Sequence, residues 1–588
     1  MINRFSRSAA AALSLVLTLS VLASAQQQQQ PSPQPRRGEV RPGPVGPIGP
    51  RGARERAARP SASATVALEE DFTEALTIVE ENYVDGQKID YGTAFKSSII
   101  GMLRTLDPHS NFYDAKEFEE LQASWRSVYY GIGASIIDRQ VKGEAATYII
   151  ATFEGAPAFR AGLRFGDRIL EVDGQSVVGK NSAEVRDKLR GPQSTVVRVT
   201  VEKAATLARE TVEITRDAIS QPTVQNAYFI RPGIAYIDIR EFNRTTAEEF
   251  SAALEELRKQ GMTQLVLDLR NNPGGMLDQA IKVASRFLPR GQVVLSQVGR
   301  RPEGGGNRDY RSENSNPDNL PLVVLVNRNS ASASEIVAGA LQDHDRALVI
   351  GETTFGKGLV QSIIPTEYGT GLTLTSTKYL TPSGRLIQRD YSNEGLYDYY
   401  TRGGIPDGDG QSAKPAATPA GPESLTDTGR KVYGGGGIAP DEPAKPRPVT
   451  APQQRLIDPV FAFVRELVNG RIRGHEDLKI GRAIEFNRNL KADEYALTDN
   501  LFKSFKAFTL ADPTNKLTEA QLDKGREFIA RQMRYDISTA SYGTVTATQA
   551  LNADDPQVSK AIDVLPRARE LAAAALKGRN PNSKSFDE

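Results

Sequence analysis

A strand, a tight turn, a helix and a second strand follow one another without interruption over residues 322–361. The apolar, β-branched run at 322–326 predicts a buried strand, and the spacing of apolar residues predicts a helix over 333–343. Such alternation is typical of an α/β core. Ser332 stands at the predicted helix start, where free N–H groups and the helix dipole stabilise negative charge. Because an attacking hydroxyl and the oxyanion it produces require that setting, Ser332 is the candidate nucleophile.

The choice of a base for Ser332 is narrow, because the chain has three histidines and no cysteine. His344 is the nearest histidine, but the helix puts it roughly 15–18 Å away. Lys357 lies in Thr-Phe-Gly-Lys-Gly and can act as a base near neutral pH if its pKa falls by roughly 3 units. Gln361 could hold the amine without adding negative charge. A helix-capping serine and a surface lysine are the alternative interpretation.

Two motifs in this stretch resemble the active-site segment of the carboxy-terminal processing (tail-specific) peptidases, serine proteases with a Ser/Lys dyad. They are Ser-Ala-Ser-Ala-Ser-Glu at 330–335 and Gly-Glu-Thr-Thr-Phe-Gly-Lys-Gly-Leu-Val-Gln at 351–361. The resemblance implies that Ser332 is the nucleophile, Lys357 the general base and Gln361 the residue that positions the lysine. Asp343 falls where some members carry an acidic residue, and we interpret it as a structural carboxylate at the helix end.

Glycines after another predicted strand complete the candidate active site. Asp-Leu-Arg-Asn-Asn-Pro-Gly-Gly, residues 268–275, precedes a predicted helix, a position that presents backbone N–H groups to a ligand. Gly274 or Gly275 could therefore form an oxyanion hole with the N–H of Ala333. A simple strand-to-helix turn is the alternative. For the core as a whole, the resemblance implies the β-β-α superhelical fold shared with crotonases and the Clp protease.

Residues 128–220 have the pattern of an inserted PDZ domain. Ala-Gly-Leu-Arg-Phe-Gly-Asp-Arg-Ile-Leu-Glu-Val-Asp-Gly occupies 161–174. Such domains bind an extended peptide by strand addition, while N–H groups of a glycine-rich loop hold its terminal carboxylate. The predicted loop consists of Tyr130, Gly131, Ile132, Gly133 and Ala134. Arg168 is expected beside the groove, where it could contact the peptide or a carboxylate elsewhere; a solvated strand charge is the alternative.

The other regions flank this core. We predict a signal peptide over 1–25, a disordered linker over 26–63, an N-terminal helical region over 64–127, a peptidase core over 221–450 with an insertion loop over 391–436, and a C-terminal helical region over 451–588. His109, in the Leu-Asp-Pro-His-Ser run that ends the N-terminal helices, is interpreted as an interface or capping residue. The C-terminal helices could be a lid, a dimer element or a substrate arm.

The predicted signal peptide and the family resemblance together imply an exported, periplasmic serine endopeptidase, membrane-associated if the signal is retained, that reads the apolar C-terminal tails of protein substrates. The net charge of +1 gives no case for nucleic-acid binding. We expect no metal, no cofactor and no membrane span after signal removal. The resemblance implies a homodimer, and we also consider an adaptor lipoprotein as a partner. The alternatives are a non-catalytic PDZ scaffold on a protease-like domain and a crotonase-type acyl-transfer or hydratase enzyme.

Overall fold

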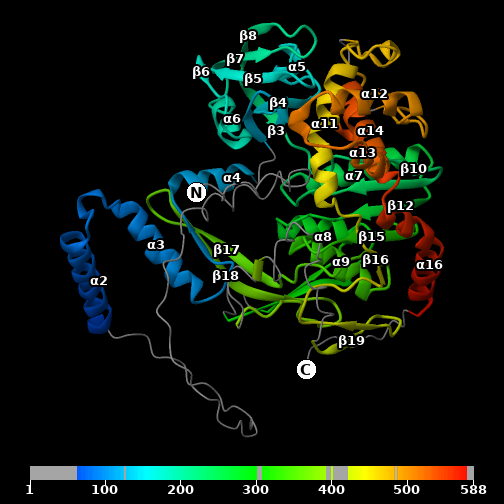
Figure 1. The fold of residues 1–588 in the computed structure, drawn as a ribbon. Helices are drawn as coiled ribbons and strands as arrows, with labels where there is room; N and C mark the ends of the chain where they lie inside the picture. Colours follow the sequence, from blue (N-terminus) through cyan, green and yellow to red (C-terminus); the bar gives the residue numbers. More distant parts are fainter. Residues whose placement is uncertain are drawn as a thin grey trace, which may run out of the picture. The chain divides into compact units, whose positions relative to one another are not determined.

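The computed structural model describes residues 62–124, 128–300, 307–392, 399–400, 421–481, 484–486 and 488–578. The predicted signal peptide, nearly all of the linker and much of the insertion loop lie outside these residues. The chain divides into two units, of which the first ends at Met102 and the second begins at Leu103. Figure 1 shows their elements in sequence colours.

The first unit is helical within its described residues. It contains α2 (Ala62–Asn82), the short η1 (Gly86–Lys88) and most of α3 (Tyr91–Arg104). Both long helices expose large apolar side chains, among them Phe72, Ile78, Val79 and Phe95. Exposed apolar side chains that recur at helical spacing are unusual on a solvated helix and are typical of an interaction face.

A mainly parallel sheet forms the centre of the second unit, in the strand order β10-β11-β12-β15-β16-β21. Its strands are β10 (Ala227–Arg231), β11 (Ile234–Asp238), β12 (Gln264–Asp268), β15 (Leu322–Val326), β16 (Leu348–Gly351) and β21 (Glu442–Pro443). One face packs against α7 (Thr246–Lys259), α8 (Leu277–Ser285) and α9 (Ala333–Asp343). The strand predicted at 322–326 and the helix predicted at 333–343 are confirmed as β15 and α9. Every residue of β15 is buried, as expected of a parallel strand covered on both faces.

A second, antiparallel sheet contains the strand that follows Lys357. It comprises β1 (Asn111–Tyr113), β13 (Val293–Gly299), β14 (Arg308–Arg311), β17 (Leu359–Pro365) and β18 (Gly371–Leu380). Strand β18 lies at the centre of this sheet. It pairs with β17, with β1 and with β13. The helix α4 (Ala115–Ser124) follows β1, and a small hairpin joins β19 (Glu423–Leu425) to β20 (Lys431–Tyr433).

The inserted domain predicted at 128–220 forms its own sheet, in the order β3-β4-β5-β7-β8 with β6 beside β5. Its elements are β2 (Val128–Gly131), β3 (Ala134–Val141), β4 (Glu144–Thr152), α5 (Pro157–Arg160), β5 (Arg168–Val172), β6 (Gln175–Ser176), α6 (Ser182–Leu189), β7 (Val196–Glu202), β8 (Arg209–Thr215) and β9 (Asp217–Ser220). Strand β2 pairs with β9 where the chain enters and leaves the domain. Strand β3 is an edge of the larger sheet and contacts α6.

The C-terminal helices pack against both the inserted domain and the central sheet, side by side with the former in Figure 1. They are α11 (Ala451–Leu467), α12 (Asp499–Leu510), α13 (Glu519–Lys524), α14 (Arg526–Tyr542), α15 (Thr544–Asn552) and α16 (Pro556–Gly578), with the short η2 (Glu476–Leu478) and η3 (Pro513–Asn515). Tyr148 of β4 meets Phe461 of α11 edge-on, with ring centroids 5.1 Å apart. The buried Arg465 pairs with Glu202 of β7 at 2.7 Å. The region is therefore part of the fold of this unit.

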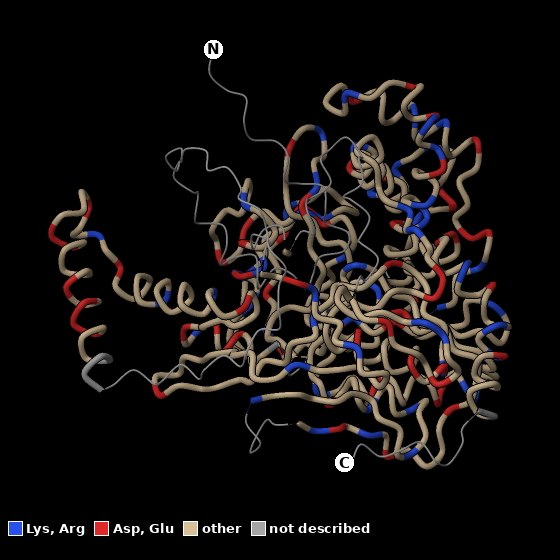
Figure 2. The backbone as a smooth tube through the Cα atoms, turned by 90° about the horizontal axis from the view of Figure 1, so that it is seen from below, with Lys and Arg blue, Asp and Glu red and all other residues tan. Residues whose placement is uncertain are grey.

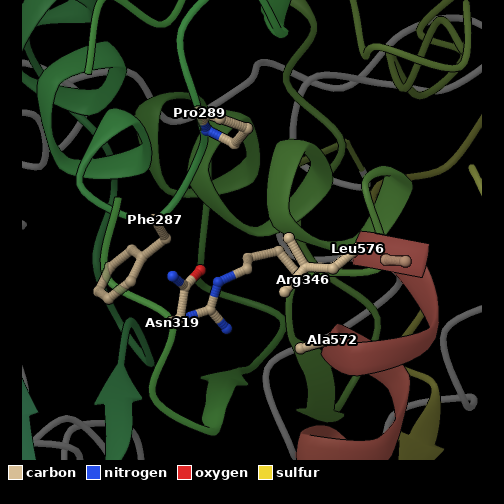
Figure 3. Close-up of a pocket in the computed structure, with 7 residues that line it drawn as sticks. Phe287, Pro289, Asn319, Arg346, Ala572 and Leu576 are labelled. Carbon is tan, nitrogen blue, oxygen red and sulfur yellow. The ribbon is translucent and has the colours of Figure 1, made fainter. Parts of the chain in front are cut away.

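Helix α16 covers the face of the central sheet opposite α7, α8 and α9. At its end lies a hollow of about 10 Å³, lined in part by Phe287, Arg346 and Leu576 (Figure 3). That volume corresponds to roughly one water molecule. Acidic and basic residues are interspersed along the backbone of the second unit in Figure 2. None of the described helices has the length and apolar character needed to cross a bilayer.

Candidate active site

Ser332 lies at the junction of the turn after β15 with α9, in a strained backbone conformation. Its φ of 54° and ψ of −111° are rare for a residue with a side chain, and such strain persists only when the surroundings enforce it. Ser330 supports the turn, because its hydroxyl donates to the carbonyl of Leu269 at 2.8 Å. The N–H of Ala333, first in the helix, has no acceptor among the described residues. The predicted nucleophile thus stands beside an available donor.

Gly274 lies directly against this turn. A Cβ atom at Gly274 would come within 2.8 Å of the Ser332 Cβ and 2.9 Å of the Ala333 nitrogen, so no larger residue fits. Its own N–H is already used, because it donates to Oδ1 of Asn272 at 2.8 Å. Gly274 therefore brings the loop close to the serine without offering a donor itself.

Gly275 offers the donor that Gly274 lacks. The loop is braced on either side of it by Phe242, whose N–H donates to Gly274 at 2.8 Å and whose carbonyl accepts from Met276 at 2.7 Å. Gly275 has a φ of 136°, and a Cβ there would meet the Phe242 carbonyl oxygen at 2.0 Å. It is exposed, and among the described residues its N–H has no acceptor. Of the two predicted glycines, only Gly275 therefore has an N–H without an acceptor among the described residues.

Lys357 is half-buried at the start of the segment that leads into β17. Burial lowers the pKa of its amine from 10.5 to about 8, although the carboxylates of Glu335 and Asp107 act in the opposite direction. The shift has the direction that the sequence-based interpretation requires. A substantial fraction of the amine is therefore neutral slightly above pH 7, when it can accept a proton.

Glu335 joins the serine and lysine segments, a role that the sequence reasoning missed. It is fully buried, and its Oε2 accepts from the N–H groups of Ser332 at 2.8 Å and Lys357 at 2.9 Å. Its Oε1 accepts from the Thr354 hydroxyl at 2.5 Å and the Gly356 N–H at 2.7 Å. Burial raises its pKa, and these four hydrogen bonds oppose that rise. The signal available in the sequence was its position three residues after Ser332, the spacing of a capping box.

Gln361 lies on β17, where its side-chain amide donates to the Thr375 hydroxyl of β18 at 3.1 Å. The backbone N–H of Thr375 in turn donates to the hydroxyl of Ser110 at 3.0 Å. These bonds connect Gln361 with the turn that precedes β1. Its predicted contact with the lysine amine stays a prediction.

The Leu-Asp-Pro-His-Ser turn, residues 106–110, lies near Lys357 although it comes from a distant part of the chain. Asp107 accepts from the N–H groups of His109 at 2.7 Å and Ser110 at 2.8 Å. Burial, followed by the nearby charge of Lys357, lowers the pKa of His109 to about 3. Its imidazole is therefore neutral at ordinary pH, and Nε2 lies 2.8 Å from the hydroxyl of Tyr399. The interpretation of His109 as a capping or interface residue did not include this proximity to the lysine.

Tyr399 belongs to the predicted insertion loop and lies within the wall of this site. Its hydroxyl accepts from the Gln388 amide at 3.1 Å, and the same Gln388 accepts from the N–H of Gly358 at 2.9 Å. The ring also meets Phe355 edge-on, with centroids 5.7 Å apart. The described part of the insertion thus supports the lysine segment.

Asp343 and His344, at the C-terminal end of α9, both form polar contacts with other segments of the chain. Asp343 is buried, forms an ion pair with Arg385 and accepts from the Ser383 hydroxyl at 2.7 Å. His344 lies 2.9 Å from a carboxylate oxygen of Asp427. These contacts agree with the interpretation of Asp343 as a structural carboxylate.

The predicted peptide loop of the inserted domain connects β2 to the edge strand β3. The Ile132 carbonyl accepts from Ala158 at 2.7 Å, and the Gly133 carbonyl accepts from Phe153 at 3.0 Å. Gly133 has a φ of 72°, which glycine tolerates best. Tyr130 and Gly131 pair with β9, and Ala134 begins β3.

Arg168 lies on β5, and β4 separates that strand from β3. Its guanidinium forms an ion pair with Glu144 at 2.9 Å. Of the two contacts considered from the sequence, the structure therefore contains the one with a carboxylate elsewhere in the chain. A contribution of Arg168 to peptide binding stays a prediction.

The sequence matches Peptidase family S41 over residues 233–394 and a PDZ domain over residues 154–203. It is 36% identical over 326 residues to the carboxy-terminal-processing protease of Bartonella bacilliformis, covering 54% of this chain and 72% of that protein. It is 37% identical over 297 residues to the carboxyl-terminal-processing protease of Synechocystis sp., covering 50% of this chain and 68% of that protein. A solved photosystem II D1 C-terminal processing protease is 32% identical, covering 53% of this chain and 88% of that one, with a TM-score of 0.30.

The mixed α/β core with its S41 match and the inserted domain with its PDZ match define the class: peptidases of family S41 that carry a PDZ domain. The chain belongs to the carboxy-terminal processing protease family, as the motifs around Ser332 and Lys357 implied.

Proposed function

We propose that the protein is an exported serine endopeptidase that reads the C-terminal tail of a protein substrate through its PDZ domain and cuts the chain with a Ser332/Lys357 dyad. One observation carries the proposal: the carboxylate of Glu335 holds the backbone of both residues through one oxygen atom. A structural serine and a surface lysine would not require such a connection. The lowered pKa of Lys357 supports the same assignment.

In the proposed reaction, the neutral amine of Lys357 takes the proton of the Ser332 hydroxyl as the oxygen attacks the scissile carbonyl. The carbonyl oxygen becomes an oxyanion that accepts from the N–H groups of Ala333 and Gly275. The lysine ammonium then protonates the departing amine, and the C–N bond breaks to leave an ester on Ser332. Water, deprotonated by the same lysine, hydrolyses the ester and restores the hydroxyl. Gln361 is proposed to orient the lysine.

The oxyanion assignment distinguishes between the two glycines. Gly275 donates and Gly274 provides only proximity, because the Gly274 N–H is already bonded to Asn272. A single donor of this kind contributes roughly 2.7–4 kcal/mol to transition-state stabilisation. Substitution of either glycine is expected to inactivate the enzyme, through lost backbone approach in both cases.

Tail recognition is proposed at β3, the edge strand of the inserted sheet. An extended peptide would add to that edge beside α6, with its terminal carboxylate at the N–H groups of residues 130–134. The position of β3 at the end of its sheet supports this, since an edge strand has unpaired backbone groups. Substrates with apolar C-termini are the expected class.

The remaining expectations are proposals of the same kind. We propose the domain boundaries given above, a crotonase- and Clp-like superhelical core, periplasmic location after export, and a homodimer, with an adaptor lipoprotein as a further partner. The apolar side chains exposed on α2 and α3 support the homodimer. No observation favours the scaffold or acyl-transfer alternatives over the peptidase.

A fluorophosphonate label followed by peptide mapping tests the proposal. We expect labelling of Ser332 in the parent, and loss of both labelling and proteolysis in Ser332→Ala. Lys357→Ala and Lys357→Arg should also lose activity, because arginine stays protonated and cannot serve as a base. A folded parent that binds tail peptides but takes no label would instead identify a scaffold. Retention of activity within about tenfold in Lys357→Ala would overturn the dyad.

A further inference from the structure

We propose that the C-terminal helices support catalysis: the start of α16 holds Arg270, and Arg270 positions the loop that presents the Gly275 N–H. The inference deepens the proposed function and rests on it. Arg270 and Asp555 are assigned as positioning residues, since neither is placed against the substrate. The family match ends at residue 394, so α16 lies beyond it.

Arg270 lies in the loop that presents the Gly275 N–H, which we call the oxyanion loop. Its guanidinium binds two separate sets of acceptors. Its Nε and Nη2 donate to the carboxylate of Asp268, the last residue of β12, over 2.6–3.0 Å. Its Nη1 donates to Oδ2 of Asp555 at 2.6 Å and to Oε1 of Gln557 at 2.8 Å. The Arg270 side chain is 12% exposed, and the two carboxylates raise its pKa further above the ordinary value. The arginine is therefore a fixed cation between the sheet and α16.

The two carboxylate oxygens of Asp555 accept hydrogen bonds from different groups. Oδ1 accepts from the N–H groups of Gln557 at 2.8 Å and Val558 at 3.3 Å, and so caps the start of α16. Oδ2 is the atom that accepts from Arg270. Because these hydrogen bonds are separate, a substitution can remove the contact with the arginine while retaining the cap.

The start of α16 is itself well anchored, which a positioning element requires. The amide of Gln557 donates to the carbonyl of Ala444 at 2.8 Å. Just before the helix, the amide of Asn552 donates to the hydroxyl of Tyr228 on β10 at 2.8 Å. Val558 and Leu565 are buried against the central sheet. Arg270 is thus held by groups that cannot easily move.

The rest of the oxyanion loop is held from inside the core. Asn271, with a φ of 60°, accepts from the Asn327 amide at 2.8 Å, and the Asn272 amide donates to the Ile239 carbonyl at 2.8 Å. Arg270 connects the outer side of the loop to α16. If that connection is lost, we expect Gly275 to shift relative to Ser332. Misplacement of a catalytic group by about 1 Å can cost roughly 100-fold in rate, so a partial shift should cost about tenfold.

Asp555→Asn and Asp555→Ser provide the test in the full-length enzyme, because both residues still cap a helix but neither offers a carboxylate to Arg270. Lys560→Met is the matched control: Lys560 pairs with Glu442 at 2.5 Å and so also ties α16 to the sheet, but at β21, away from the loop. We expect the Asp555 variants to lose about tenfold in kcat with KM unchanged. Lys560→Met should keep both constants. Full kcat in folded Asp555 variants would overturn the proposal, as would an equal loss in the control.

Inhibition by a peptide aldehyde provides a second measurement. The inhibition constant would not change if Asp555 had only a structural role. The adduct of the aldehyde with Ser332 carries an oxyanion, whereas a cleaved product peptide does not. The inhibition constant for the aldehyde should rise about tenfold in the Asp555 variants while product affinity stays constant. Gln557→Met, which removes the other acceptor of Arg270, should act in the same direction, and an unchanged constant there would count against the proposal. A parent that neither takes the fluorophosphonate nor binds the aldehyde would mark failure of the dyad instead.

Discussion

Ser332 and Lys357 donate their backbone N–H groups to the same oxygen, Oε2 of Glu335, at 2.8 and 2.9 Å. The carboxylate thereby fixes the separation of the start of α9 from the segment before β17. Two residues from different secondary-structure elements are held together by a group that needs no direct contact with substrate.

Glu335→Gln should lower kcat by about 100-fold or more while leaving a folded protein. Glutamine has a single acceptor oxygen, so two of the four donors now bound by the carboxylate would lose their partner, each at about 1–3 kcal/mol. Steady-state kinetics and urea unfolding measure the two effects. Glu352→Gln, which removes the nearby ion pair with Arg328, is the control and should change kcat little. Near-parental kcat in Glu335→Gln would show that the shared carboxylate is dispensable.

The activity should rise with pH until the lysine is neutral. Because the pKa of Lys357 is about 8, kcat/KM should fall about tenfold per unit below that value and level off above it. A pH profile measured on a peptide whose own groups do not titrate in this range provides the check. A flat profile between about pH 6 and 9 would contradict a lysine base.

Stability should depend on pH through the same residue. The pKa of Lys357 is 10.5 in an ordinary setting and about 8 in the fold, so between these values the unfolded chain binds more protons. The folded state is therefore expected to gain stability from this group as pH rises from about 8 to 10.5. Urea unfolding of the parent and Lys357→Met across that window isolates the effect. A constant difference between the two proteins would exclude it.

Asp107→Asn should move the pH profile to lower values. The Asp107 carboxylate raises the pKa of Lys357, so removing its charge leaves burial less opposed. The midpoint of kcat/KM against pH measures this shift. Ser110→Ala is the control, since it removes a hydrogen-bonding partner of Asp107 at 2.6 Å but retains the charge. If both variants move the midpoint equally, packing and not charge is responsible.

A free apolar C-terminus should accelerate cleavage. A carboxylate bound by backbone N–H groups contributes about 1.5–3 kcal/mol, so a substrate with a C-terminal amide should lose roughly 10–100-fold in affinity. Addition of Asp-Asp to the tail should have a similar effect. Competition with free tail peptide supplies the control, and equal KM values for all three substrates would show that the tail is not read.

Local patterns in the sequence were sufficient to predict several features of this protein. The β-branched run that forms β15 and the helical spacing of α9 depend on neighbours within a few residues, and both elements have the predicted bounds. The motifs around Ser332 and Lys357 likewise identified the family. The need for a lowered lysine pKa followed from elementary acid–base chemistry, and burial in the fold lowers it.

Tertiary structure decided the features that depend on contacts between distant segments. The sequence could not predict that the Asn272 side chain accepts from the N–H of Gly274 and not from that of Gly275. Nor could the sequence predict that His109 lies near Lys357 and Tyr399. The contact of Asp555 with Arg270 was equally unpredictable. The sequence also left open what the C-terminal helices contact, and in the structure they pack against the PDZ domain and the central sheet. Periodicity records which side chains are buried; only the folded chain determines which surfaces bury them.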